Sequence, residues 1–370
     1  MRVPLVDLVA QQREIAEEIA PRIQAVFDSA AFIGGAVVTE FEQAYARHIG
    51  VEHVIGVANG TDALELALRV AGVAAADEVI VPANTFIATV EAVSRIGAIP
   101  VLVDVDPVQL LIDPSEAEQA ITTRTKAIVP VHLFGQTAPM ERLEKLSEEY
   151  GLAIVEDAAQ AQGAQRSGRP AGGFGIAAAT SFYPGKNLGA AGDAGAVLSN
   201  DADVAARVRT IAAHGSDRKY VHDVVGFNSR LDAVQAVVLQ AKLGRLTEWN
   251  DLRRKAAARY AELLTDVPEV RLPVSDPMNA DVWHLFVVQV DERDRVLAEL
   301  NSADIGAAVH YPTPIHLTGA YAHLGRRSGD FPTAETAAER ILSLPLYPHI
   351  TTEQQEYVAD ALTRACQAAR

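Results

Sequence analysis

The 370-residue chain contains a single cysteine, Cys366, so it cannot form an intrachain disulfide framework and has no cysteine cluster for zinc. Positive charge is also in short supply, because 32 Lys and Arg residues stand against 48 Asp and Glu residues, for a net charge of −16. Such a chain presents no basic footprint for a nucleic-acid backbone. We therefore expect no nucleic-acid partner and a reducing, cytoplasmic location.

Long apolar runs are absent as well. No stretch of eighteen apolar residues is free of charge, and Asp7 interrupts the N-terminal segment where the apolar region of a secretory signal would continue. What the chain does have is 49% hydrophobic residues over a length that exceeds the usual limit of one core. These features predict a protein with two lobes and no membrane partner.

Short apolar runs alternate with helical patterns between about residues 50 and 200. We expect strands over residues 54–57, 78–81, 99–103, 127–131 and 152–155, and helices over 62–71, 86–96 and 140–150. The runs are continuous rather than alternating in polarity, which is typical of parallel strands buried on both faces. The pattern predicts an α/β domain with a mostly parallel sheet.

Polar clusters follow four of these runs, at residues 59–62, 82–86, 132–136 and 157–160. Ligands bind outside the carboxyl ends of parallel strands, so the four clusters should meet at one edge of the sheet. Further along, a helical pattern over residues 231–265 should link the lobes, and a strand from Trp283 and a helix over 293–302 should follow it. We expect a large domain over residues 1–250 and a smaller one over 251–370.

The run from Ser181 to Gly195, SFYPGKNLGAAGDAG, isolates Lys186 on a glycine-rich turn between two apolar segments. Most lysines are solvated surface charges. Here the surroundings hold almost no other charge, so partial burial should favour the neutral amine, which is the nucleophile that Schiff-base chemistry requires. The same amine can then move a proton as a general base and a general acid.

Asp157 and Gln160 come at the end of the run LAIVEDAAQ, which is expected to be a buried strand. A buried carboxylate needs a partner, and a protonated pyridine nitrogen would be one. The structural alternative for Asp157 is a cap on the next helix. Together with Lys186, these residues indicate a pyridoxal phosphate enzyme, in which Gln160 would contact the ring hydroxyl.

The segment Asn59-Gly60-Thr61-Asp62 lies at an expected strand-to-helix junction, where free backbone N–H groups and the helix dipole attract anions. A cofactor phosphate fits there, and Ser181 could add a hydroxyl. The structural alternative is an ordinary N-cap by Thr61 or Asp62. Phe86 is the candidate to stack on the pyridine ring, against the alternative of a core aromatic.

Basic and polar residues precede the long helical pattern. His214, Arg218, Lys219 and His222 fall in a loop that could reach anionic phosphates, and Asn228 and Arg230 come just before the helix. His310 and His316 form a histidine pair, but no carboxylate or cysteine stands near them at ligand spacing. We therefore expect no metal site.

These motifs resemble those of the DegT/DnrJ/EryC1/StrS family of pyridoxal-phosphate sugar aminotransferases. The resemblance covers nearly the whole chain, from VDL at Val6 through NGTDAL, EDAAQ, SFYPGKNLG and NSRLD to SLPLYP at Ser343. It implies the type I aminotransferase (aspartate aminotransferase) fold, with a large α/β domain, a smaller C-terminal α/β domain and a homodimer whose active sites are shared.

The resemblance also implies residue roles. Lys186 would carry the cofactor, Asp157 would pair with its ring nitrogen and Gln160 would lie near its hydroxyl. Phe86 matches the stacking aromatic, Gly60, Thr61 and Ser181 match phosphate contacts, and Asn228 would reach the phosphate in the partner subunit. The residues expected to contact the substrate are Tyr183, His214, Arg230, His310, Tyr311 and His316.

The family implies L-glutamate as amino donor and a keto sugar nucleotide as acceptor. Its dehydratases have histidine at the lysine position, so Lys186 favours amination. The segments around Val131, Trp283 and His310 resemble enzymes that aminate C-3 of dTDP-3-keto-6-deoxyhexoses, whereas HGSDRKY at His214 resembles enzymes of UDP-linked 3-keto uronic acids; a 4-keto sugar stays open. Gln162 replaces the family's usual histidine and could indicate a different sugar environment.

Two alternatives remain from other classes of function. One is a cofactor-binding regulator without transaminase activity, and the other is an amino-acid decarboxylase or lyase of the same fold.

Overall fold

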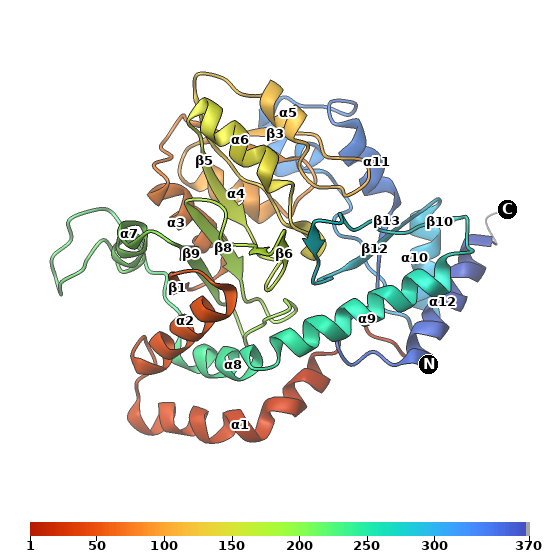
Figure 1. Cartoon of the computed structure of the whole chain (residues 1–370), viewed down its shortest axis with the longest axis horizontal. Helices are drawn as coiled ribbons and strands as arrows, with labels where there is room; N and C mark the ends of the chain where they lie inside the picture. The colour runs from red at the N-terminus through yellow and green to blue at the C-terminus, as the bar shows by residue number, and fades with distance from the viewer. Residues whose placement is uncertain (368–370) are drawn as a thin grey trace.

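The computed structural model describes residues 1–367 and centres on a seven-stranded sheet (Figure 1). Its strand order is β1-β9-β8-β5-β4-β2-β3, and β9 alone runs against its neighbours. The strands are β1 (His53–Val57), β2 (Glu78–Pro82), β3 (Ile99–Val103), β4 (Thr125–Ile128), β5 (Ala153–Asp157), β8 (Ala177–Ser181) and β9 (Gly195–Ser199). The expected mostly parallel sheet is confirmed.

Both faces of this sheet are buried, because successive side chains of a strand point to opposite faces. In β2, Val79 and Val81 pack into one core with α3 and α4, whereas Ile80 packs into another with α6. The helices around the sheet are α1 (Leu8–Ser29), α2 (Ala36–Ile49), α3 (Gly60–Val70), α4 (Ile87–Arg95), α5 (Pro114–Gln119), α6 (Met140–Tyr150) and α7 (Ala202–Ala212). Burial on both faces explains why the strands read as continuous apolar runs.

The chain after the sheet begins with two helices, α8 (Ala233–Leu243) and α9 (Leu246–Leu264). The expected helical region over 231–265 is therefore interrupted at Gly244 and Arg245. Figure 1 shows α9 as a long helix that runs from the large sheet toward the C-terminal elements. Because α9 crosses residue 250, a domain boundary there stays a prediction.

The C-terminal part of the chain contains a second sheet, which is antiparallel and three-stranded. Its strands are β10 (Val270–Arg271), β12 (Phe286–Val290) and β13 (Ile341–Leu344). It packs with α9, α10 (Arg293–Ser302) and α12 (Thr352–Gln367) around a separate apolar core. Val3 belongs to this core and pairs with Ile305. The N-terminal segment thus contacts the C-terminal elements, although we had assigned it to the large domain.

The remaining elements are short. They are η1 (Leu133–Gly135), β6 (Gln165–Arg166), β7 (Arg169–Pro170), β11 (Asn279–Ala280), η2 (Ile315–Leu317), η3 (Gly319–Leu324) and α11 (Pro332–Arg340). Strands β11, β6 and β7 form a third small sheet. Among residues 1–367, no helix has both the length and the apolar character needed to cross a bilayer.

Candidate active site

A cavity of about 470 Å³ opens at the carboxyl ends of the parallel strands. All four polar clusters expected there contribute to it or lie directly beneath it. The polar and aromatic residues that line it are Asn59, Thr61, Thr85, Phe86, Thr89, Asp157, Gln160, Ser181, Tyr183, Lys186, Asp193, His284, His310 and Tyr311, together with Gly60. Its size is that of a small-molecule site.

Lys186 enters the cavity from the turn between β8 and β9. The turn is closed by backbone hydrogen bonds from Lys186 N to Tyr183 O (2.8 Å) and from Ala190 N to Phe182 O (2.7 Å), and Phe182 is fully buried beneath it. Burial lowers the pKa of Lys186 to about 8, while the nearby charge of Asp157 opposes this shift. The turn therefore holds an amine that is partly neutral at physiological pH.

Asp157 stands at the end of β5 and is 5% exposed. Its Oδ2 accepts a hydrogen bond from Thr89 Oγ1 (2.7 Å) and its Oδ1 accepts one from Ala159 N (3.1 Å). Burial raises the pKa of Asp157, and the Thr89 hydrogen bond and the charge of Lys186 oppose the rise. No helix begins here, so the carboxylate is not a helix cap and is available to a ligand in the cavity.

Gln160 has a fixed amide orientation. Its Oε1 accepts a hydrogen bond from Phe134 N (2.6 Å), and its Nε2 donates to Tyr311 Oη (3.2 Å). Nε2 therefore faces the cavity with a second hydrogen to donate, as contact with a ring oxygen requires.

The N-terminus of α3 forms the far end of the cavity. Asn59, rather than Thr61 or Asp62, is the N-cap, because its Oδ1 accepts from Asp62 N (2.8 Å). The first N–H groups of a helix have no partner within it, so Gly60 and Thr61 present a positive helix end. Ser181 lies directly against Gly60, since a Cβ on Gly60 would come 2.7 Å from Ser181 Cβ. The predicted phosphate contacts are thus adjacent.

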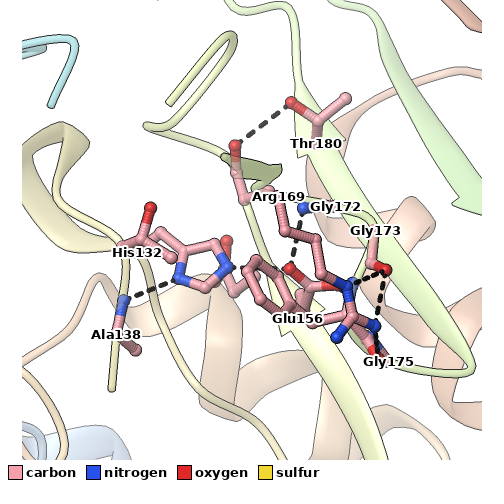
Figure 2. Close-up of polar contacts among 12 residues, drawn as sticks. His132, Ala138, Glu156, Arg169, Gly172, Gly173, Gly175 and Thr180 are labelled. Atoms are coloured by element: carbon pink, nitrogen blue, oxygen red, sulfur yellow. Dashed lines mark hydrogen bonds and ion pairs between the residues drawn. The ribbon is translucent and has the colours of Figure 1, made fainter. Parts of the chain in front are cut away.

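A second carboxylate, Glu156, precedes Asp157 on β5, and Figure 2 shows its polar contacts. It is fully buried and accepts hydrogen bonds from His132 Nε2 (2.9 Å) and from the backbone N–H groups of Gly172, Phe174 and Gly175 at 2.7 to 2.9 Å. Burial opposes ionisation, but His132 and the backbone N–H groups of Gly175 and Gly172 lower the pKa of Glu156. Glu156 thereby ties the loop after β7 to β5, next to Asp157.

Aromatic and imidazole groups surround the cavity entrance. Phe86 is 50% exposed and Tyr183 is 60% exposed, and the rings of Phe86 and Tyr311 lie 5.2 Å apart. His310 Nδ1 is paired with Ser343 Oγ (2.8 Å), and burial together with the charge of Lys186 lowers the pKa of His310 to about 4. These groups can contact a ligand through ring faces and neutral polar atoms.

Four predicted residues, Asn228, Arg230, His214 and His316, lie outside this cavity. Asn228 and Arg230 are exposed, are joined by a hydrogen bond from Arg230 Nε to Asn228 Oδ1 (2.9 Å), and line a neighbouring hollow that shares Asp193 with the cavity. His214 begins the loop between α7 and α8, which projects away from the body of the molecule in Figure 1. Within one chain, these residues do not complete the site.

His316 corrects the prediction of a substrate contact. It is 2% exposed, its Nε2 is paired with Glu335 Oε1 (2.9 Å), and its ring packs on Phe331 with centroids 4.8 Å apart. Its histidine chemistry is used to hold the start of α11, not to face the cavity.

Gln162 also lies elsewhere than expected. It is 1% exposed, does not line the cavity, and its Nε2 donates to Ser181 O (2.8 Å) and Thr180 Oγ1 (2.9 Å). Gln162 therefore supports the backbone at the start of the lysine turn.

Sequence reasoning missed Thr89 and His284. A helix that starts at Ile87 places Thr85 and Thr89 one turn apart, and their hydroxyl oxygens lie 2.8 Å from each other, so helical spacing was a usable signal for Thr89. His284 was read as part of a strand, but β12 begins only at Phe286. Nothing in the local sequence places His284 in the same cavity as Lys186.

Curated relatives align with this chain almost from end to end. It is 46% identical over 362 residues to the erythromycin biosynthesis sensory transduction protein EryC1 of Saccharopolyspora erythraea, covering 98% of this chain and 99% of the relative. It is 45% identical to a dTDP-3-amino-3,4,6-trideoxy-α-D-glucose transaminase of Streptomyces venezuelae, over 98% of this chain and 95% of the relative. A UDP-N-acetyl-3-dehydro-α-D-glucosamine 3-aminotransferase of Acidithiobacillus ferrooxidans is 44% identical, over 98% of this chain and 97% of the relative.

Solved structures show the same fold. DesV of S. venezuelae, crystallised with a ketimine intermediate, superposes with a TM-score of 0.97 at 44% identity and covers 99% of both chains. NtdA of Bacillus subtilis, solved with bound cofactor PMP, has a TM-score of 0.89 at 31% identity and covers 96% of this chain and 82% of that one. The expected type I aminotransferase fold is confirmed.

The cavity fits pyridoxal phosphate, which is the cofactor of this enzyme. Lys186 supplies the amine that would hold it, Asp157 the carboxylate for its ring nitrogen, and the close contact between Gly60 and Ser181 a cradle for its phosphate. When bound, the cofactor supplies an electron sink for the carbon that gains or loses the amino group. The protein would supply orientation, and Lys186 an amine able to move protons.

Residues 13–363 match the family model of the DegT/DnrJ/EryC1/StrS aminotransferases. The aligned relatives, the shared fold and the cavity agree with this match. The chain is therefore a member of the DegT/DnrJ/EryC1/StrS aminotransferase family.

Proposed function

We propose that this aminotransferase moves an amino group from L-glutamate to the C-3 keto group of a sugar nucleotide, with a dTDP-3-keto-6-deoxyhexose as the leading acceptor. The single observation that carries the proposal is Lys186, held beside Asp157 in a cavity whose entrance is lined by neutral polar and aromatic groups. The names of the S. venezuelae and A. ferrooxidans relatives support C-3, since both specify a 3-amino product or a 3-keto substrate. They name different nucleotides, dTDP and UDP.

The distribution of positive charge supports a shared site. Lys186 is the only lysine or arginine that lines the cavity among residues 1–367, and two aspartates line it too. A nucleotide diphosphate needs cations, and this chain carries Arg218, Lys219 and Arg230 on or beside the projecting loop, away from its own cavity. We infer a homodimer in which the loop, Asn228 and Arg230 of one protomer complete the cavity of the other.

The projecting loop also has the surface of an interface. Tyr220 and Val225 are 83% and 93% exposed, and Val221 and Val224 are exposed as well. Apolar side chains gathered on one protruding segment are costly in water and are typical of a surface that another protein covers. We infer that a second copy of the chain covers this surface, because the cavity of one chain lacks the cations that the loop of another chain would supply.

The decisive experiment offers the purified enzyme L-glutamate and, separately, dTDP-3-keto, UDP-linked 3-keto uronic acid and dTDP-4-keto sugars, with mass spectrometry of the products. We expect an amino sugar from the dTDP-3-keto substrate and formation of 2-oxoglutarate. Lys186→Ala should lose turnover by about 10³-fold or more, because it removes the proton-transferring group. Lys145→Ala, an exposed lysine on α6, is the matched control and should keep full activity.

Amination of the UDP or the 4-keto substrate alone would overturn the assignment of the acceptor. Turnover in Lys186→Ala equal to the unmodified enzyme would overturn the placement of the active site. Reaction of amino acids by loss of carbon dioxide, with no amino transfer to any sugar, would instead indicate the decarboxylase alternative.

A regulatory role is a second candidate because the name of the S. erythraea relative includes sensory transduction. The same panel separates the two. Binding of a keto sugar nucleotide without any amino product would favour a regulator, whereas catalytic turnover favours an enzyme. We also infer a cytoplasmic location, on the single buried cysteine, Cys366.

A further inference from the structure

The imidazole of His132 closes the buried loop 132–138, which follows β4. Its Nδ1 accepts a hydrogen bond from the backbone N–H of Ala138 at 3.1 Å, so this ring nitrogen carries no hydrogen. The ring is therefore neutral, and its one N–H is on Nε2, which donates to Glu156 Oε2 at 2.9 Å. Figure 2 shows the ring between these two partners. One side chain thus joins the end of the loop to its start and to β5.

The backbone fixes the start of this loop to β5 as well. His132 N donates to Asp157 O at 3.0 Å, and Asp157 N donates to Pro130 O at 2.9 Å. The loop therefore leaves the sheet directly beside the residue whose carboxylate is expected to pair with the ring nitrogen of the cofactor. Its remaining freedom lies between residues 133 and 138.

Within the loop, Phe134 holds its backbone N–H against the active site. Phe134 N donates to Gln160 Oε1 at 2.6 Å. Its φ of +63° lies in the left-handed region, which costs free energy for a residue with a Cβ, so surrounding contacts must hold this conformation. Leu285 N donates to Phe134 O at 3.3 Å from outside the loop. The bond from Ala138 to the ring of His132 is the contact that closes the loop on itself.

The N–H of Phe134 decides which way the amide of Gln160 faces. A backbone N–H can only donate, so it selects the amide oxygen. The other partner, Tyr311 Oη, lies 3.2 Å from Gln160 Nε2, but a hydroxyl can donate as well as accept and would satisfy either orientation. Without the N–H of Phe134, the amide could turn over and present an oxygen where a donor to the ring hydroxyl is expected.

We propose that His132 is a positioning residue for the cofactor ring: by accepting from Ala138 it holds the loop 132–138 in the shape that keeps the N–H of Phe134 on Gln160. Gln160 Nε2 then has a hydrogen to donate to the ring hydroxyl of pyridoxal phosphate. The inference rests on the proposed contact between Gln160 and that hydroxyl, and not on the sugar acceptor. His132 is fully buried and does not line the cavity, so it acts on the ring only through the loop.

Two substitutions separate the two ring nitrogens of His132. His132→Gln places an amide near the position of Nε2 that can still donate to Glu156, but it leaves the N–H of Ala138 without an acceptor. His132→Asn places an amide oxygen near the position of Nδ1 that can accept from Ala138, and gives up the bond to Glu156. The pair therefore distinguishes closure of the loop from general support of the fold.

The measurement is the affinity of the cofactor-free full chain for pyridoxamine 5′-phosphate and for its 3-deoxy analogue, which lacks the ring hydroxyl, by calorimetric titration. Neither compound has an aldehyde to react with Lys186, so the ratio of the two Kd values reports contacts with the hydroxyl. For the unmodified protein we expect a ratio of about ten, the strength of one hydrogen bond. In His132→Gln the ratio should fall to about two or less, because that hydrogen bond is lost. In His132→Asn it should stay at the unmodified value, although both variants lower the melting temperature.

An unchanged ratio in His132→Gln would overturn the proposal, and so would equal falls in both variants, since the effect would then run through Glu156. Tyr311→Phe tests the same chain of contacts if neither His132 variant folds. It leaves the N–H of Phe134 on Gln160, so the ratio should stay at the unmodified value, and a fall would assign the amide orientation to Tyr311 and contradict the proposal. No sugar and no turnover enter these titrations, so failure here is distinct from failure of the proposed function.

Discussion

Asp157 illustrates how one side chain is prepared for chemistry by its neighbours. Burial makes its charged form costly, and the hydrogen bond from Thr89 reduces that cost. A side chain of Asp157 that is less fully ionised would hold a protonated ring nitrogen of the cofactor less well. Thr89 thus acts on the cofactor through Asp157.

We expect Thr89→Val to lower kcat about tenfold at neutral pH, which corresponds to loss of one hydrogen bond to a charged group. The pKa of Asp157, already raised, would rise further, so a larger share of the carboxyl would be protonated. Because a carboxyl with a raised pKa ionises as the pH rises, activity should recover toward alkaline pH. Steady-state kinetics from about pH 6 to about pH 9 provide the measurement, a range that includes the ordinary pKa of histidine and stays below that of lysine.

Thr39→Val, at an exposed threonine on α2 that does not line the cavity, is the control. It should change kcat little. Equal losses in the two variants, or a loss in Thr89→Val that does not depend on pH, would contradict this role of Thr89.

At the scale of elements, the site depends on how closely α3 approaches β8. Gly60 opens α3 and touches Ser181 at the end of β8, and Gly195 opens β9 with a similarly close approach to Asn59. Side chains at these positions would separate the helix end from the hydroxyl of Ser181. These two glycines would therefore set the width of the proposed phosphate site.

Gly60→Ala should weaken binding of pyridoxal phosphate about tenfold and destabilise the cofactor-free protein by about 1–3 kcal/mol, the usual range for overpacking. Absorbance titration with the cofactor and thermal unfolding measure the two effects. Gly319→Ala is the control, because no atom lies within 4 Å of its added Cβ, and it should stay within about 0.5 kcal/mol. Unchanged cofactor affinity in Gly60→Ala would show that the phosphate lies elsewhere.

Elements with strong local patterns were predicted well. The helices over residues 140–150 and 293–302 and the strand over 99–103 match α6, α10 and β3 at both ends. Strands β8 and β9 were not predicted, because their residues are mostly Ala, Gly and Ser, which have weak strand preference. They form only because β5 offers a partner edge, which is a long-range contact.

At the scale of the molecule, the proposed homodimer would complete the site of each chain with residues of the other. The cavity of one chain contains Lys186, while Asn228 and Arg230 line a neighbouring hollow. Two copies related by twofold symmetry could exchange these residues, because a twofold interface uses the same surface on both subunits.

Mixing of subunits tests this arrangement. Lys186→Ala and Arg230→Ala proteins should each be weakly active, but co-refolded together they should recover roughly a quarter of the unmodified activity. Half of the dimers formed by random pairing are mixed, and each mixed dimer has one site with both native residues. Activity equal to the average of the two parents would indicate that each chain completes its own site. Co-refolding with unmodified protein controls for the refolding yield.

The sequence by itself determined the parts of this protein that depend on local chemistry. The buried strands, the lysine turn and the residues Asp157, Gln160 and Lys186 were all recognisable, because strand burial, turn residues and functional side chains lie close together along the chain. Only the tertiary structure decided that His316 pairs with Glu335, that Gln162 supports the lysine turn, and that His284 lines the same cavity as Lys186. These outcomes depend on contacts between segments distant in sequence, since the partner of a buried polar atom is selected by packing and not by its neighbours in the chain.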